Sequence, residues 1–287
     1  MPTKIEKDDV TGQMTTGHEW DGLRELNRPV PRWWVYVFYA TIAWSLVYFL
    51  LYPSVPGITG YYHGLIGYYQ RDAADADVAA VAKQRAGAMD RIKAMSFADI
   101  RKDPELFAVA QVAGRITFAE NCQPCHGAGG GGNQGYPALA AGNWLWGGKL
   151  EDIYQTITFG IRSGQDNARQ SQMPRFGADG ILKPAEVQAV AGHVMALYGD
   201  PAADSAEGKR VFAANCVQCH GAAGQGVREF GGARLASKVH LHGDDLAAVL
   251  AQINSPHMGV MPNWNTRLDE AKIKSVAIYV HSLGGGE

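Results

Sequence analysis

NCQPCHG at residues 121–127 and NCVQCHG at residues 215–221 are two copies of one short motif, and they hold all four cysteines of the chain. Two thiols separated by two residues and followed directly by histidine have the spacing of covalent haem attachment. A zinc site, a redox-active dithiol and a short disulfide are the alternatives, but a dithiol gives the following histidine no role. The motifs therefore predict two covalently bound haem c groups. Their thioether-forming residues are Cys122, Cys125, Cys216 and Cys219, and their proximal iron ligands are His126 and His220.

The residues around these motifs form an internal repeat. A shift of 94 positions places Gly114, Phe118 and Asn121 on their counterparts Gly208, Phe212 and Asn215. The end of the unit recurs at a shift of 86, where Val190 and Val194 match Val276 and Val280. Each unit is thus expected to begin and end with a helix.

Composition and turn signals divide the chain into five expected segments. The stretch GDPAADSA at 199–206 has linker composition and puts a boundary near Asp200. Asp103 and Pro104 have the pattern of an N-cap and first helical residue. The expected segments are 1–32, a cytoplasmic N-terminal segment; 33–52, a transmembrane anchor; 53–102, an interfacial and helical linker; 103–199, the first haem domain; and 200–287, the second.

The residues from Trp33 to Tyr52 form a charge-free apolar run that is long enough to cross a bilayer as a helix. Lys and Arg precede this run at positions 4, 7, 24, 28 and 32, whereas none follows it until Arg71, so the positive-inside rule places the N-terminus in the cytoplasm. We expect an uncleaved single anchor, because the run is too long for a signal peptide and no A-x-A site follows it. Residues 61–69 are too short to span again and are expected to rest at the membrane interface.

A second axial ligand for each iron is predicted from the methionines. Met173 and Met261 both precede proline after a cysteine motif, in QMPRF and VMPNW, and are the expected sixth ligands. Met195 fits a packing role on a helix, and Met258 lies close to Met261 as an alternative ligand. Five histidines leave bis-histidine ligation open: His193, His240, His242, His257 and His281. Spacing does not decide whether a methionine serves its own unit or the neighbouring one.

Charge and glycine content exclude some classes of function. The formal net charge is only −2 and charged residues make up 19% of the sequence, which disfavours nucleic acid as a partner. Glycine-rich stretches follow both motifs and lack the GK[ST] ending of a phosphate-binding loop, so they are expected to let backbone approach a haem edge. For Arg162, in FGIRSG, two roles are open: its guanidinium pairs with a haem propionate, or it is a solvated arginine on the surface.

The anchor, the tandem units and the phrases NWLWGG (143–148), FGIRSG (159–164), QMPRFG (172–177) and VMPNW (260–264) resemble the CcoP (FixP) family of dihaem subunits of bacterial cbb3-type cytochrome c oxidases. The resemblance covers the chain from the anchor to the last helix. It implies an all-α fold with two tandem class I cytochrome c domains, in which first and last helices pack together around the haem.

This resemblance also implies partners and a location. Electrons would pass from a soluble cytochrome c or a quinol-oxidising complex toward the catalytic haem–copper oxidase subunit, beside a membrane cytochrome c subunit. The haem domains would lie in the periplasm of a bacterial inner membrane. No catalytic residue is expected in this chain, because one span cannot gather the histidines of a haem–copper centre.

Two other functions remain open at the level of sequence. One is a free-standing membrane dihaem cytochrome that shuttles electrons from a quinol-oxidising complex to other reductases. The other is a haem peroxidase or sensor that uses a vacated axial position on iron.

Overall fold

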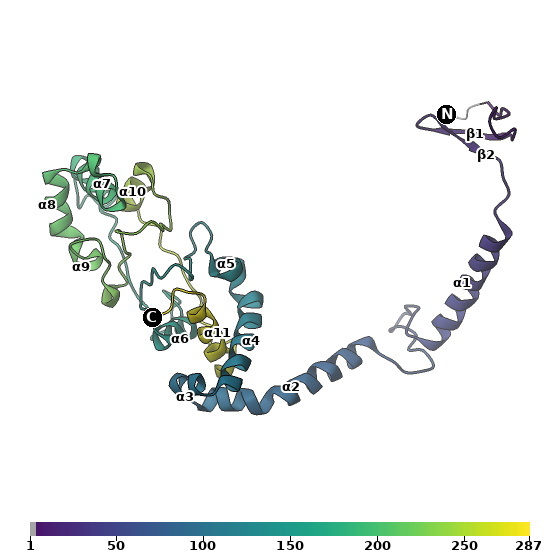
Figure 1. Ribbon diagram of the computed structural model, residues 1–287, viewed down its shortest axis with the longest axis horizontal. Helices are drawn as coiled ribbons and strands as arrows, with labels where there is room; N and C mark the ends of the chain where they lie inside the picture. The colour runs from purple at the N-terminus through teal and green to yellow at the C-terminus, as the bar shows by residue number, and fades with distance from the viewer. Residues whose placement is uncertain (1–3) are drawn as a thin grey trace. The chain divides into compact units, whose positions relative to one another are not determined.

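Helices form most of the computed structural model, which describes residues 4–287; residues 1–3 of the expected N-terminal segment lie outside the described residues. Contacts divide the chain into two units, Met1–Ala82 and Lys83–Glu287. The mainly helical class predicted from the sequence is confirmed. Figure 1 shows the elements with their labels.

A small β-hairpin precedes the anchor. Strands β1 (Thr15–Trp20) and β2 (Leu23–Leu26) pair antiparallel, with Trp20 opposite Leu23. The two-residue turn consists of Asp21 and Gly22, whose φ angles of 48° and 84° suit the Asp-Gly turn that matches strand twist. This hairpin is the only sheet among residues 4–287, and the all-α expectation did not include it.

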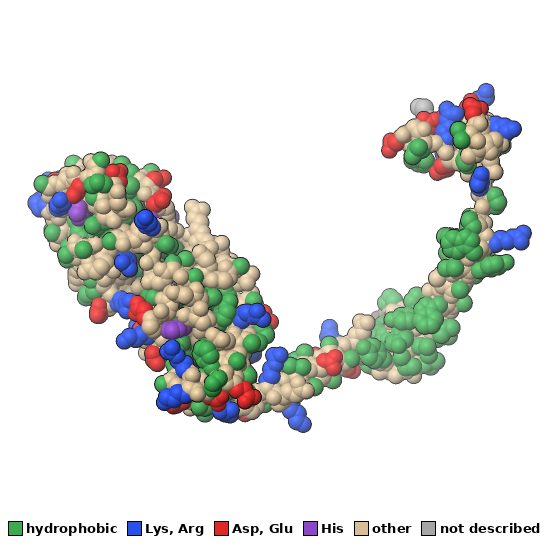
Figure 2. Space-filling view, viewed as in Figure 1, with side chains coloured by type: hydrophobic (Ala, Val, Ile, Leu, Met, Phe, Trp, Pro, Cys, Tyr) green, Lys and Arg blue, Asp and Glu red, His purple; other side chains and the backbone are tan. Residues whose placement is uncertain are grey.

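Helix α1 (Arg32–Leu51) has the length and composition of a membrane span and begins one residue before the predicted run. None of its side chains is buried, and hydrophobic side chains cover its visible face in Figure 2. The following segment turns back on the end of the helix, where the Leu65 and Ile66 amides donate to the Leu50 and Leu51 carbonyls at 3.0 and 3.2 Å. These bonds satisfy carbonyls that a helix end otherwise leaves without partners.

The second unit begins within a long helix and contains both cysteine motifs. Asp103 caps α4 by accepting from the Leu106 amide at 3.0 Å, as its sequence pattern predicts. The longer helices are α2 (Gln70–Ala94), α3 (Phe97–Lys102), α4 (Pro104–Asn121), α6 (Leu150–Phe159), α7 (Pro184–Tyr198), α8 (Ala206–Asn215), α10 (Leu246–Asn254) and α11 (Glu270–Ser282). The short ones are α5 (Gln123–His126), η1 (Ala128–Gly130), η2 (Pro201–Ala203), α9 (Val217–His220) and η3 (Arg228–Phe230).

The two sequence repeats exchange their terminal helices. Helix α11, the last of the chain, packs along α4, while α7 packs against α8 and α10. Figure 1 shows these two groups of helices. The first-with-last helix packing expected for a cytochrome c unit therefore occurs between the repeats rather than within each of them.

Glycine allows each of these helix pairs to approach closely. A Cβ atom on Gly114 of α4 would lie 2.1 Å from the Ser275 carbonyl oxygen of α11. At the corresponding crossing, a Cβ on Gly208 of α8 would lie 2.3 Å from the Ala189 carbonyl oxygen of α7. One turn later Phe118 contacts Tyr279, with ring centroids 5.4 Å apart, so aromatic packing extends the α4–α11 crossing.

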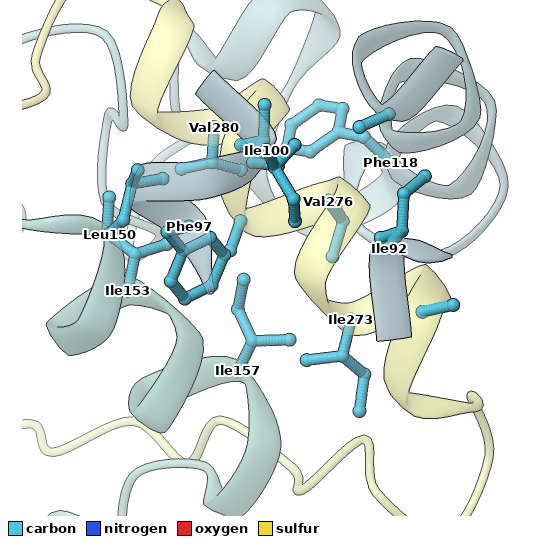
Figure 3. Packing of buried hydrophobic residues seen from close by; sticks show 14 of the residues in the cluster. Ile92, Phe97, Ile100, Phe118, Leu150, Ile153, Ile157, Ile273, Val276 and Val280 are labelled. Atoms are coloured by element: carbon cyan, nitrogen blue, oxygen red, sulfur yellow. The ribbon is translucent and has the colours of Figure 1, made fainter. Parts of the chain in front are cut away.

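Two apolar cores follow from this exchange, and each draws on both repeats. The first lies among the end of α2 and helices α3, α4, α6 and α11, and Figure 3 shows ten of its side chains labelled. The second lies among α7, α8 and α10. Neither core is completed by one repeat alone, since the first repeat contributes α7 to the second core and the second contributes α11 to the first.

Substitution of Gly114 by alanine tests the exchanged packing. Alanine favours a helix by about 1 kcal/mol, but crowding against Ser275 should cost about 1–3 kcal/mol, so Gly114→Ala is expected to lower the thermal unfolding midpoint. The midpoint is measured by circular dichroism on the purified full chain. Gly87→Ala is the matched control, because no atom lies within 4 Å of a Cβ there and its helix should be slightly stabilised. A Gly114→Ala midpoint as high as that of the control contradicts the close crossing.

Candidate haem-binding sites

The two cysteine motifs form the same short helical turn. In the first, the Cys125 and His126 amides donate to the Cys122 carbonyl at 3.2 and 2.9 Å. The second repeats this arrangement at Cys216, with the same two distances. All four cysteines are free thiols. Each turn therefore presents two thiols and one imidazole from a single rigid backbone segment.

The histidines of the two motifs, His126 and His220, are each held through one ring nitrogen. His126 Nδ1 lies 3.0 Å from the Pro137 carbonyl oxygen, and His220 Nδ1 lies 2.8 Å from that of Ala233. Because a carbonyl only accepts, Nδ1 carries the proton in each bond and leaves Nε2 with a free lone pair. Burial lowers the pKa of both histidines, which favours the neutral imidazole, the form that iron ligation would require.

The first thiol of each motif lies in a desolvated environment. Burial, and then the neighbouring Cys125 thiol, raises the pKa of Cys122 to about 11. Cys216 is also raised to about 11 by burial and by Cys219. Both therefore remain neutral thiols near pH 7, and each carries the sulfur and the hydrogen that a thioether bond to a haem vinyl group would take up.

The methionine loops cross between the repeats. Met261 packs at the edge of the first core together with Cys122, although it belongs to the second repeat. Its backbone pairs with Ile161, since each amide donates to the other residue's carbonyl at 3.0 Å. Met173, of the first repeat, packs with Cys216 at the edge of the second core. Each of these methionines thus packs against the same apolar core as the first cysteine of the other repeat's motif.

The other candidate ligands have different surroundings. Met195 packs against the second core, whereas Met258 is exposed. His193 Nδ1 lies 2.9 Å from Asp204, and His281 Nε2 lies 3.0 Å from the Glu287 carbonyl oxygen. The remaining three histidines contact other rings: His240 stacks on Tyr198, and His242 lies beside His257.

Two buried donors without partners fit an anionic group. Trp146 Nε1 and Arg169 Nε are buried and make no hydrogen bond. Their side chains are neighbours, because the Arg169 guanidinium carbon lies 5.5 Å from the centre of the Trp146 ring. Buried N–H groups are rarely left unsatisfied, and a haem propionate would supply the carboxylate oxygens that both donors need. The thiols, the imidazoles and this pair therefore fit haem c.

Arg162 is half-buried rather than fully solvated, and burial lowers its pKa. Its guanidinium donates to the Gly259 and Ser171 carbonyl oxygens and to the Ser171 hydroxyl. None of the ion pairs among residues 4–287 includes Arg162. Its hydrogen bonds therefore go to protein backbone and hydroxyl groups.

Several of these groups have no clear signal in the sequence. The carbonyls that hold the two histidines come 11 and 13 residues after them, at Pro137 and Ala233, so the spacing does not repeat. Trp146 stands in a phrase that the sequence singles out, but Arg169 has no motif around it. The only signal for this pair is that tryptophan and arginine are both side chains that can donate a hydrogen bond to a carboxylate.

Two family descriptions match this chain. "N-terminal domain of cytochrome oxidase-cbb3, FixP" matches residues 12–59, which include the hairpin and the anchor. "Cytochrome C oxidase, cbb3-type, subunit III" matches residues 110–194 and 203–280, one segment for each cysteine motif. The family implies haem c as cofactor and a place among the subunits of a respiratory oxidase.

Full-length relatives agree with this assignment. The cbb3-type cytochrome c oxidase subunit FixP of Bradyrhizobium diazoefficiens is 47% identical, with 100% of both chains covered. The subunit CcoP of Cereibacter sphaeroides is 46% identical over 100% of both chains. FixP of Azorhizobium caulinodans is 44% identical over 98% of this chain and 96% of its own. This chain belongs to the CcoP (FixP) family of cbb3-type cytochrome c oxidase subunits.

Proposed function

We propose that this chain binds two haem c groups and carries electrons from a periplasmic or membrane donor to the oxygen-reducing subunit of a cbb3-type oxidase. The proposal rests on one observation above all: each Cys-Cys-His turn shares a core with the methionine of the other repeat. Two protein ligands to each iron, a histidine and a methionine, would suit a carrier, because they would leave no position for oxygen. We assign no catalytic residue to this chain.

The ligand sets are proposed to be crossed. Cys122, Cys125 and His126 would hold the first haem c with Met261, and Cys216, Cys219 and His220 would hold the second with Met173. When bound, haem c supplies a one-electron ferrous–ferric couple, whose potential thioether ligation raises. The protein would hold both irons in fixed ligation, since each methionine loop hydrogen-bonds a helix end of the opposite repeat: Trp264 N to Ile157 O, and Ala178 N to Asn254 O.

Trp146 and Arg169 would hold a propionate through their free N–H groups. The Asp152 carboxylate lies 3.4 Å from Arg169 Nη2 and forms an ion pair with it, so the guanidinium would already be oriented when a propionate binds. The apolar side chains around each site, such as Phe118 and Phe212, would exclude water from the haem faces. Preorganised ligation and a dry site both keep the structural change on electron transfer small.

We further propose a single membrane pass with the N-terminus in the cytoplasm and the haem units in the periplasm. The distribution of Lys and Arg around α1 supports this orientation. The proposed partners are the haem–copper catalytic subunit and a membrane cytochrome c subunit of the same complex, with a soluble cytochrome c or a quinol-oxidising complex as donor. The lipid bilayer surrounds the anchor.

The crossed ligation is tested in chains that keep one haem. With Cys122 and Cys125 replaced by alanine, only the second haem remains covalently attached. Met173→Ala is then expected to abolish the long-wavelength charge-transfer band of the ferric haem, and to lower its potential by about 0.1–0.3 V within the roughly 0.8 V range set by axial ligands. Absorption spectroscopy and redox titration measure both effects.

Met261→Ala is the matched control in this one-haem chain and should leave band and potential unchanged. In the converse chain, in which Cys216 and Cys219 are replaced, the two methionines should exchange roles. If each methionine instead affects the haem of its own repeat, the crossed assignment is wrong. If neither substitution changes the spectrum, methionine ligation itself is wrong.

The oxidase partnership is tested by purification of the tagged chain in mild detergent. We expect a stable complex that consumes oxygen and contains a haem–copper subunit, because the family consists of oxidase subunits. Subunits are identified by mass spectrometry, and cyanide-sensitive oxygen uptake is measured with an electrode. A dihaem protein that purifies alone with no oxygen uptake contradicts the proposed partnership and favours a free-standing cytochrome.

A further inference from the structure

Arg162 has an unusual backbone conformation for a residue with a side chain. Its φ is 53°, and Asp21 is the only other non-glycine residue with positive φ in the described part of the chain. A left-handed conformation costs free energy for a side-chain-bearing residue and is retained where surrounding contacts offset it. The hydrogen bonds of the Arg162 guanidinium are the contacts that offset this cost.

The guanidinium of Arg162 bonds two separate loops. Nε and Nη2 donate to the Gly259 carbonyl oxygen at 2.8 and 2.6 Å. On its other side, Nη1 donates to the Ser171 carbonyl and hydroxyl oxygens at 3.2 and 3.0 Å. Four hydrogen bonds from one charged, planar group fix its orientation, and a lysine ammonium cannot reproduce that fork.

These two loops are the methionine loops. Ser171 precedes Met173 by two residues, and Gly259 precedes Met261 by two residues, so Arg162 bonds equivalent positions of the two repeats. Ser171 belongs to the first repeat and Gly259 to the second. A single side chain therefore connects the backbone just ahead of both proposed iron ligands.

The backbone next to Arg162 reinforces the connection. Ile161 forms two 3.0 Å hydrogen bonds with Met261, and a Cβ on Gly160 would lie 2.3 Å from the Met261 carbonyl oxygen. Toward the other loop, the Arg162 amide donates to the Arg169 carbonyl at 2.9 Å, two residues before Ser171. Both loops are thus anchored to the same short segment, 160–162.

We propose that Arg162 is a positioning residue that holds both methionine loops, so that the two axial ligations are coupled through its guanidinium. This inference rests on the proposed assignment of Met173 and Met261 as iron ligands. The Arg162 side chain differs from one that makes an ordinary surface contact, because its loss would weaken methionine ligation at both irons.

The test compares Arg162→Gln with Arg175→Gln in the full-length haem-loaded protein. Arg175 lies two residues after Met173, but it is exposed and only 3.7 Å from Asp179, so it serves as the matched control. Imidazole competes with methionine for ferric iron, and its apparent affinity is read from the loss of the methionine charge-transfer band. Each haem is measured separately in the two one-haem chains.

Arg162→Gln is expected to increase imidazole affinity about tenfold or more at each of the two haems, because charged hydrogen bonds to both loops are lost. Arg175→Gln should stay within about twofold of the parent at both haems. Arg162→Lys should restore at most one of the two haems to the parent value, since one ammonium cannot span both carbonyls. An effect of Arg162→Gln at one haem alone, or at neither, overturns the proposal.

Hydrogen exchange supplies a readout that does not depend on the ligand assignment. Amides of 169–175 and 257–263 should exchange faster together in Arg162→Gln and remain as in the parent in Arg175→Gln. If the methionine variants change neither haem while both segments loosen, the ligand assignment fails and the connection between the loops stands. If the methionine variants behave as expected while exchange in these segments is unchanged, the role of Arg162 is wrong.

Discussion

The packing of α11 on α4 is the interaction on which the second unit depends. Gly114 lets the two backbones approach until a Cβ would overlap the Ser275 carbonyl, and Gly208 does the same for α8 against Ala189 of α7. Because these helices come from different repeats, neither repeat can close its apolar core without the other. The chain must therefore pass from the first core to the second and return before either cofactor site is complete. Such long-range pairing is slow to form but leaves the two sites in one packed body.

The exchange of terminal helices between the repeats also holds the two proposed haem sites in a fixed arrangement. Contacts between the repeats extend beyond the helices: the Asn143 side chain donates to the Ser237 hydroxyl at 2.6 Å, and the Glu287 amide donates to the Gly148 carbonyl oxygen at 3.0 Å. A Cβ on Gly231 would overlap the Trp146 ring, so the loop after the second motif lies directly on a residue of the first repeat. Two cytochrome domains joined only by a flexible linker would sample many separations. Here shared cores fix the separation, which suits stepwise electron transfer within one chain.

The sequence motifs predict the local structure of the chain more fully than the way its helices pack. The motifs predict the cysteine turns because two thiols and a histidine leave few other uses, and the apolar run predicts α1 because its length matches a bilayer. The hairpin does have a sequence signal, because EWDGLR contains the Asp-Gly pair of a two-residue turn between strands, but the all-α expectation does not include it. The exchange could not be predicted, because Ser275 and Ala189 occupy equivalent positions and either helix presents the same pattern to Gly114. Pattern alone does not distinguish two partners that have the same shape.

The repeats differ at one place that matters for both sites. Leu150 and Leu246 begin equivalent short helices 96 residues apart, whereas Met173 and Met261 are 88 apart, so the first repeat has a longer segment between helix and methionine. This added segment turns back on itself, as Ile161 and Arg169 form a bridge, and it contains Arg162. Related repeats that pack symmetrically would give both irons similar surroundings. An insertion in one repeat that bonds both methionine loops introduces a difference between the sites and connects them at the same time. The asymmetry of the sequence thus provides what the symmetry of the fold cannot, namely one segment whose Arg162 side chain bonds both methionine loops.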